Sequence, residues 1–243
     1  MTASERNGST DDFVDVTVPD GKFRAFVARP SKLPAASIVV LHELFGINDD
    51  MKATCREVAD HGYVAFCPDL FWRQEPGVSL SHFDETDWRK GWALGAGFDV
   101  DKAVADIAAT ILQARTLVDR SGKVGVLGYC LGGLLTFLTA ARTGADAAVA
   151  YYPGGADKYL VDAGRAMTPI IVHLGEQDEY ISKDAQQAIR SALSDNPNTQ
   201  TFSYPYQSHA FARHGGEHYD AAAAALAHGR TWEHFDRNLQ SDQ

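Results

Sequence analysis

The stretch GKVGVLGYCLGG, from Gly122 to Gly133, joins an apolar run to a cluster of glycines around one cysteine, Cys130. The apolar run predicts a buried β-strand, and the residues LLTFLTAAR that follow predict a helix. Gly128 to Gly132 therefore have the form Gly-x-Cys-x-Gly at a strand-to-helix junction. A nucleophile on so sharp a turn adopts strained backbone angles, and larger side chains in place of the glycines would collide with the strand and helix. The stretch predicts a reactive cysteine held at the tip of a turn.

The same position would activate the sulfur. A helix N-terminus favours thiolate through the positive end of the helix dipole, and the N–H of Leu131 is free to donate to an oxyanion. The alternative is that Cys130 is a small buried hydrophobe, as free cysteines often are. That alternative is favoured for Cys55 and Cys67, which fall on the apolar face of a predicted helix and within a predicted buried strand.

Strand-like and helix-like segments alternate along the rest of the chain. FVDVTV and FRAFVA predict a hairpin, and further strands are predicted at ASIVVLHEL, YVAFCPDL, KVGVLGY, DAAVAYYP, PIIVHLG and TQTFSYP. Helices are expected after a cap at Asn48, from about Val100 to Val118, after Cys130, in KDAQQAIRSAL, and in the last segment, where Trp232, Phe235 and Leu239 share a face. The alternation predicts an α/β fold with a mainly parallel sheet of about eight strands and helices on both faces.

Length and composition place the chain among single-domain globular proteins. A polar tail over residues 1–12 is expected to be disordered, followed by one domain over residues 13–243. No segment approaches 18 apolar residues, which predicts no membrane span or signal peptide and hence a cytoplasmic protein. Three cysteines, without close spacing, fit free thiols in a reducing compartment. A formal net charge of -10 argues against a nucleic-acid partner.

A thiol nucleophile needs a base and a group that orients the base. In hydrolases with this kind of turn the chain order is nucleophile, acid, histidine, which selects Asp178 in HLGEQDEY and His209 in YQSHAFAR. Glu176 and Glu179 are rival carboxylates. Other downstream histidines are assigned structural or solvent-exposed roles: His173, His214 and His218.

The segment VVLHELFGIN places Glu43 at the end of a predicted buried strand. Burying a carboxylate without a partner is costly, so Glu43 either pairs with an arginine or approaches Cys130 and governs its proton. The N–H of Leu44 is the expected second oxyanion donor.

The connection from Phe71 to Phe98 is long for an α/β fold and holds Trp72, Trp88 and Trp92. These side chains either pack over the edge of the sheet or form the wall of a ligand pocket at its carboxyl end.

Taken together, HELFGIN, CPDLFWRQEPG, GKVGVLGYCLGG, HLGEQD and SHAFAR resemble the dienelactone hydrolase family, in family order and spacing and over most of the chain. The resemblance implies the α/β-hydrolase fold and a Cys130–His209–Asp178 triad. It also implies that Glu43 hydrogen-bonds the thiol and takes its proton when substrate arrives, with Leu44 and Leu131 as oxyanion donors. The implied reaction is hydrolysis of an enol-lactone, dienelactone, to maleylacetate, by a monomer with no metal or organic cofactor.

The resemblance further assigns Arg213, in HAFAR, to the substrate carboxylate, but the carboxylate site departs from the family. A second arginine of the family falls at Trp88, Trp92 stands in place of a tyrosine, and Ala210 in place of a serine. Losing one charge-assisted contact would weaken carboxylate binding by about 1.5–3 kcal/mol. Arg89 or Arg73 could compensate if either reaches the pocket.

Three functions remain open on the sequence. The first is a cysteine hydrolase that opens an enol-lactone. The second is a cysteine esterase or thioesterase for another activated ester or lactone, with Trp88 and Trp92 shaping an apolar pocket. The third is a binding module that keeps the hydrolase fold without catalysis. The presence of every catalytic residue type argues against this third function.

Overall fold

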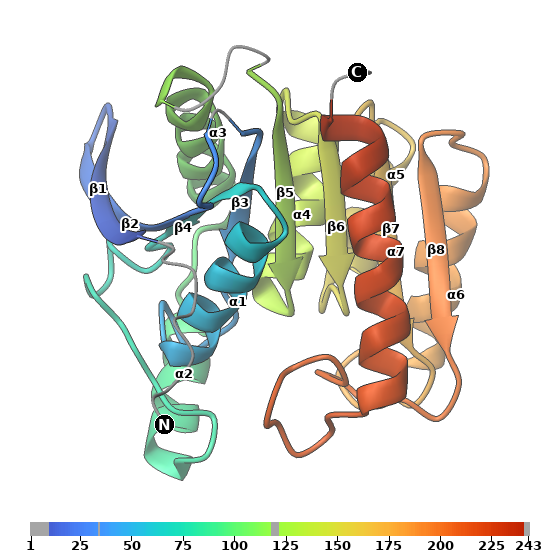
Figure 1. The fold of residues 1–243 in the computed structure, drawn as a ribbon. Helices are drawn as coiled ribbons and strands as arrows, with labels where there is room; N and C mark the ends of the chain where they lie inside the picture. The colour runs from blue at the N-terminus through green and yellow to red at the C-terminus, as the bar shows by residue number, and fades with distance from the viewer. Residues whose placement is uncertain (1–9, 34, 118–121, 241–243) are drawn as a thin grey trace, which may run out of the picture.

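The computed structural model describes residues 10–33, 35–117 and 122–240, through which one eight-stranded sheet runs in the order β1-β2-β4-β3-β5-β6-β7-β8 (Figure 1). The strands are β1 (Thr10–Val18), β2 (Gly21–Arg29), β3 (Ser37–Leu41), β4 (Val64–Pro68), β5 (Val124–Tyr129), β6 (Ala147–Tyr151), β7 (Ile170–Gly175) and β8 (Thr199–Tyr204). The β1–β2 and β2–β4 pairs are antiparallel, and every other pair is parallel. The predicted hairpin and parallel sheet are confirmed.

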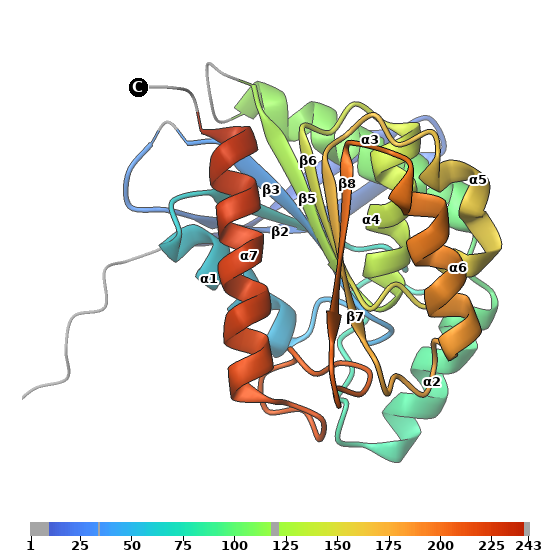
Figure 2. The same ribbon diagram turned by 90° about the vertical axis from the view of Figure 1, so that its right-hand side faces the viewer.

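Helices cover both faces of the sheet (Figure 2). Their bounds are α1 (Asp49–Asp60), α2 (Glu85–Ala96), α3 (Val100–Leu117), α4 (Leu131–Arg142), α5 (Leu160–Ala163), α6 (Lys183–Ser194) and α7 (Ala221–Leu239), with a short 3-10 helix η1 (Ala156–Tyr159). One face carries α1 and α7, and the opposite face carries α3, α4, α5 and α6. None of the helices in the described part of the chain is long and apolar enough to cross a lipid bilayer.

The sheet begins earlier than the sequence predicts. Residues 1–9 lie outside the described residues, but Thr10 to Asp12, expected in a disordered tail, form the start of β1. Asp11 and Asp12 pair with Ala28 and Val27 of β2. The ladder supplies their backbone hydrogen bonds, and Asp11 also forms a 2.8 Å ion pair with Arg56. Polar side chains therefore did not prevent pairing along this edge strand.

Two helix boundaries show how local chemistry sets the ends of helices. The Asn48 side chain accepts a 3.0 Å hydrogen bond from the Met51 N–H and caps α1, as predicted. Val118, the last expected position of the helix from Val100, lies outside the described residues. The sequence did not predict α2, which is capped by Asp84 and buries only Gly91, so that it lacks the apolar stripe by which helices are recognised.

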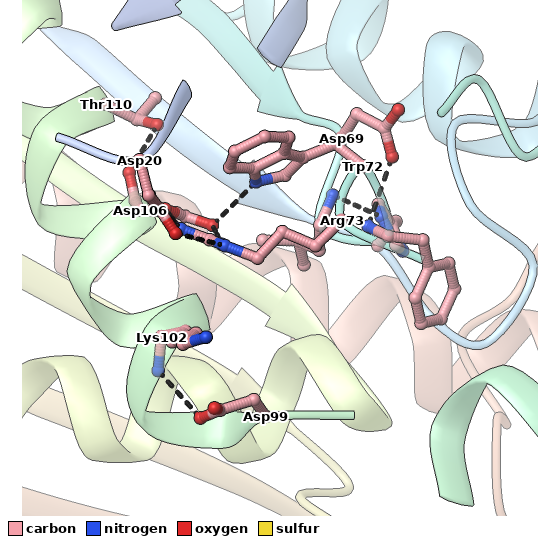
Figure 3. Close-up of polar contacts among 11 residues, drawn as sticks. Asp20, Asp69, Trp72, Arg73, Asp99, Lys102, Asp106 and Thr110 are labelled. Carbon is pink, nitrogen blue, oxygen red and sulfur yellow. Dashed lines mark hydrogen bonds and ion pairs between the residues drawn. The ribbon is translucent and has the colours of Figure 1, made fainter. Parts of the chain in front are cut away.

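Arg73 and Trp72, in the connection after β4, lie together against α3, where both bind Asp106 (Figure 3). Trp72 Nε1 donates to Asp106 at 2.9 Å, and its ring stacks on Phe23. Arg73 also pairs with Asp20 at 2.8 Å. Because Asp106 is only 1% exposed, Arg73 is committed to neutralising a buried carboxylate. Arg73 therefore does not supply the missing substrate arginine, and Trp72 packs at the sheet edge.

We expect Arg73→Met to lower the free energy of unfolding by about 2–4 kcal/mol, since it leaves the Asp106 carboxylate buried with Trp72 as its remaining side-chain partner. Urea denaturation followed by circular dichroism measures this loss. The matched control is Asp20→Asn, which removes the exposed partner of the same arginine and is expected to cost less than about 1 kcal/mol. Equal losses from the two variants would contradict a stabilising role for the buried pair.

Candidate active site

Cys130 lies between β5 and α4 with φ 54° and ψ -112°, a conformation that few L-residues adopt. The glycines around it are required by close backbone contacts. A Cβ at Gly128 would lie 2.1 Å from the carbonyl oxygen of Gly132, and one at Gly132 would lie 2.1 Å from that of Leu41. A Cβ at Gly133 would lie 2.3 Å from the Tyr151 oxygen. The turn therefore depends on glycine for steric reasons at three positions.

The turn leaves Cys130 partly exposed, whereas Cys55 and Cys67 are fully buried. Leu131 is the first residue of α4, so its N–H has no acceptor within the helix. Among the described residues, no backbone acceptor is recorded for the N–H of Leu44 or of Leu131. Both residues line the same cavity as Cys130. Two backbone donors are thus available near the sulfur.

Asp178 and His209 form a buried pair. Asp178 Oδ2 lies 2.8 Å from His209 Nδ1, while Asp178 Oδ1 accepts hydrogen bonds from the N–H groups of Tyr180 and Ile181. These two contacts fix the carboxylate, which in turn fixes the imidazole. His209 Nε2 is buried and has no hydrogen-bond partner in the described structure, so this nitrogen is free for a group in the cavity.

Neither rival carboxylate, Glu176 or Glu179, binds the His209 ring nitrogen that Asp178 binds. Glu179 accepts a 3.1 Å hydrogen bond from the backbone N–H of His209 and contacts His218, and Glu176 is exposed. His173 is a satisfied core histidine, 2.8 Å from the Tyr204 hydroxyl. His214 is exposed, and His218 Nδ1 lies 3.1 Å from the His209 carbonyl oxygen.

Opposing influences act on the proton of His209. Burial lowers the pKa of its imidazole, but negative charge at Cys130 and the hydrogen bond to Asp178 outweigh burial and raise the pKa to about 10. The imidazolium is therefore the stable form near neutral pH whenever the sulfur is ionised. Such a thiolate–imidazolium pair is a proton-transfer unit suited to acyl transfer.

Glu43 is bound by Arg213 rather than by the thiol. Arg213 donates from Nε and Nη2 to the two carboxylate oxygens at 2.7 and 2.9 Å, and both side chains are nearly buried. Among the described residues, no hydrogen bond joins Glu43 to Cys130, which differs from the contact that the resemblance implies. A bidentate guanidinium is a stronger partner for a carboxylate than a neutral thiol is, which explains the difference.

His42, next to Glu43, holds the loop that follows β3. The Leu70 N–H donates to His42 Nε2 at 3.1 Å, so the proton lies on Nδ1, which donates to the Glu43 carbonyl at 2.7 Å. Burial lowers the pKa of His42, in keeping with this neutral tautomer. His42 thus orients the backbone that carries Glu43 and the Leu44 N–H.

A cavity of about 520 Å³ opens in front of Cys130, at the carboxyl ends of the parallel strands. Glu43, His209 and Arg213 line it together with Cys130. Figure 1 shows α2 and the loop between β8 and α7 at this edge of the sheet. The chain thus brings these four predicted site residues, from three separate connections, around one cavity.

The tryptophans of α2 form part of the cavity wall. Trp88 packs edge-on against Phe45, with ring centroids 4.8 Å apart, and Trp92, which is half exposed, lies near Tyr180. Arg89 is exposed, hydrogen-bonds Thr86 and is absent from the lining among the described residues. Neither Arg89 nor Arg73 therefore replaces the arginine missing at position 88.

The sequence did not predict several side chains of the site, among them Tyr152 and Lys158. Tyr152 follows β6 with φ 36°, its ring lies 4.9 Å from that of His209, and its buried hydroxyl has no partner in the described structure. Lys158 of η1 lines the cavity and gives it a second cation beside Arg213. Lysine in a short helical turn carries no sequence signal, but Tyr152 falls at the carboxyl end of a predicted strand, where sites gather.

Comparison with known proteins agrees with this geometry. The model of the dienelactone hydrolase family matches residues 23–239. A carboxymethylenebutenolidase of Pseudomonas putida is 41% identical over 219 residues, covering 90% of this chain and 92% of the relative. Carboxymethylenebutenolidase 1 of Cupriavidus pinatubonensis is 34% identical over 223 residues, covering 91% and 95%.

The fold is also shared with solved structures. A crystal structure of a dienelactone hydrolase from Anabaena variabilis superposes with a TM-score of 0.69 at 16% identity, covering 96% of this chain and 99% of the other. The family match over residues 23–239 spans β3 to β8 and every residue of the cavity described above. By the family match and the similarity to these relatives, the chain belongs to the dienelactone hydrolase family and is a hydrolase that acts on ester bonds.

Proposed function

We propose that this protein is a cysteine hydrolase that opens an enol-lactone of the dienelactone type through a thioester at Cys130. The observation that carries the proposal is one cavity lined by Cys130, His209, Glu43 and Arg213. A thiol beside an imidazole supports acyl transfer, and a guanidinium in the same cavity supports a substrate that bears a carboxylate. The relatives named carboxymethylenebutenolidase support the lactone.

Substrate binding starts the proposed reaction. In the free enzyme Glu43 accepts hydrogen bonds from Nε and Nη2 of Arg213. A substrate carboxylate that binds Arg213 competes for these donors and releases Glu43. The freed carboxylate accepts the Cys130 proton, so that the nucleophile forms only when substrate is present.

The thiolate then attacks the lactone carbonyl. A sulfur–carbon bond forms, the ring carbon–oxygen bond breaks, and the N–H groups of Leu44 and Leu131 stabilise the oxyanion. The leaving enol oxygen takes the proton that Glu43 accepted from Cys130, which returns Glu43 to its carboxylate form. A water molecule, activated by His209 while Asp178 orients the ring, attacks the thioester and releases the acid and the Cys130 sulfur.

A cysteine esterase for other activated esters is the second candidate, favoured by the aromatic wall of Trp88 and Trp92. Simple alkyl esters are expected to react slowly because an alkoxide leaves less easily than a thiolate. Rates with cis- and trans-dienelactone, aryl esters, acyl thioesters and ethyl acetate separate the two candidates. Comparable turnover of ethyl acetate and a dienelactone would contradict both.

The test of carboxylate recognition is Arg213→Gln. We expect its kcat/KM for cis- and trans-dienelactone to fall by about 10–100-fold, because one charge-assisted contact is lost. For the uncharged 4-nitrophenyl acetate the expected loss is below about threefold. Circular dichroism and urea denaturation of Arg213→Gln are the control for the carboxylate that the change leaves unpaired. Equal losses on charged and uncharged substrates would refute the assignment of Arg213.

A further inference from the structure

A cluster of two histidines and one glutamate lies on the side of Arg213 that faces α1 and α7. It is formed by Glu57 of α1, His214 of the loop between β8 and α7, and His228 of α7. One ligand atom from each residue can be chosen so that all three lie within 4.8 Å of one another. The catalytic cysteine and histidine belong to neither this cluster nor its lining. We propose that this cluster is a binding site for a divalent transition-metal ion such as Zn²⁺.

The distances fit an ion better than they fit direct contacts. Glu57 lies 3.8 Å from His214 Nε2 and 3.7 Å from His228 Nδ1, which is too long for a hydrogen bond. Zinc–ligand bonds of about 2.0–2.1 Å in tetrahedral geometry place neighbouring ligand atoms about 3.4 Å apart. The two carboxylate–imidazole distances are within a few tenths of an ångström of that spacing, and all three ligand atoms lie within 4.8 Å of one another. Rotation of the exposed His214 side chain can close the remaining distance.

The surroundings also fit a cation. The three residues line a small cavity of about 50 Å³, which has room for an ion and a water ligand. The Glu57 carboxylate supplies the negative charge, and Arg213, which lines the same cavity, is neutralised by Glu43. Two imidazoles and one carboxylate select transition metals over Mg²⁺ or Ca²⁺, which prefer oxygen ligands.

The site has a definite place in the fold. The loop over residues 205–220 carries His209, Arg213 and His214, whereas the other two ligands lie on α1 and α7, on one face of the sheet (Figure 2). An ion bound here joins the loop to both helices, one residue away from Arg213. The ion acts as a structural clamp on the substrate-binding loop, distinct from the metal-free acyl transfer at Cys130.

Zn²⁺ titration of the full-length, untagged, EDTA-treated protein tests this site. The measurements are made in the Cys130→Ala background, so that the active-site thiol cannot serve as a ligand. We expect one equivalent of Zn²⁺ to bind by calorimetry and to raise the melting temperature, and Co²⁺ to give the visible absorption of a thiolate-free site. Absence of binding at micromolar Zn²⁺ would overturn the proposal.

Matched histidine variants locate the ion. His214→Ala changes an exposed side chain and is expected to weaken Zn²⁺ binding by at least about tenfold and abolish the rise in melting temperature. His218→Ala, four residues along the same loop and outside the cluster, is expected to bind as the parent does. His228→Gln is also expected to weaken Zn²⁺ binding, and circular dichroism verifies that each variant is folded. Equal affinity of the His214 and His218 variants would place the ion elsewhere and refute this site.

Discussion

Replacing Cys130 with alanine is expected to lower kcat/KM for dienelactones by at least about 10⁴-fold, because the nucleophile is removed while the cavity is retained. Cys130→Ser is expected to lose most of the activity as well, since a serine hydroxyl is not ionised near neutral pH and Glu43 is a weak base for it. Initial rates measured over a range of substrate concentrations give kcat/KM for both variants.

A second measurement separates loss of the nucleophile from loss of the fold. Cys55 and Cys67 are 0% exposed, so iodoacetamide is expected to modify the native protein once, at Cys130. Intact mass spectrometry with a slow acyl donor is expected to show a single acyl adduct that Cys130→Ala lacks. Acylation of the alanine variant would rule out the thioester and place the nucleophile elsewhere.

Asp178→Asn is expected to lower kcat/KM by about 10²–10⁴-fold. The N–H groups of Tyr180 and Ile181 hold one oxygen of this side chain, so asparagine keeps its position but turns its amide toward His209. The imidazole then adopts the wrong tautomer and loses a charged partner. Steady-state rates give the loss, and Glu179→Gln, which changes the neighbouring carboxylate, is the control and is expected to stay within about threefold of the parent.

The pH profile provides an independent readout of the same change. Negative charge at Cys130 is one of the causes that raise the pKa of His209 to about 10, so the imidazolium that stabilises the thiolate persists below that pH. We expect kcat/KM to fall as the pH rises through this value, because the thiolate formed on substrate binding then loses its charged partner. Removing the Asp178 charge removes one of the influences that raise this pKa, so the alkaline limb is expected to move to lower pH in Asp178→Asn. An unchanged limb would show that a group other than His209 controls it.

The parts of the site that the sequence predicts are those set by local geometry. The turn at Cys130 is readable because three of its positions have no room for a Cβ, which would lie only 2.1–2.3 Å from a backbone oxygen, so that they require glycine. The order Cys130, Asp178, His209 is readable because parallel strands bring their carboxyl ends to one edge. These features need only neighbours in sequence and the direction of the strands.

The parts that the sequence does not predict are pairings between distant segments. Glu43 and Arg213 are 170 positions apart, and only the folded chain shows that their side chains meet. The sequence leaves open whether Arg73 reaches the cavity or binds another segment, and only the folded chain shows that it pairs with the buried Asp106 of α3. The helix α2 was missed because it rests on a glycine and exposes most of its other side chains.

The contact of Gly91 with Leu44 separates two functions of the cavity, which are to hold the reacting groups and to select the substrate. A Cβ at Gly91 would lie 2.8 Å from the carbonyl oxygen of Leu44, so α2 rests directly on the backbone of the residue whose N–H we propose as an oxyanion donor. Its tryptophans project from the same helix toward the ligand space. Substitutions at positions 88 and 92 can therefore change which acids the enzyme accepts while its reacting atoms stay in place. In such an architecture, substitutions on the cavity side of one helix can change substrate choice, provided that the residue at position 91 remains glycine.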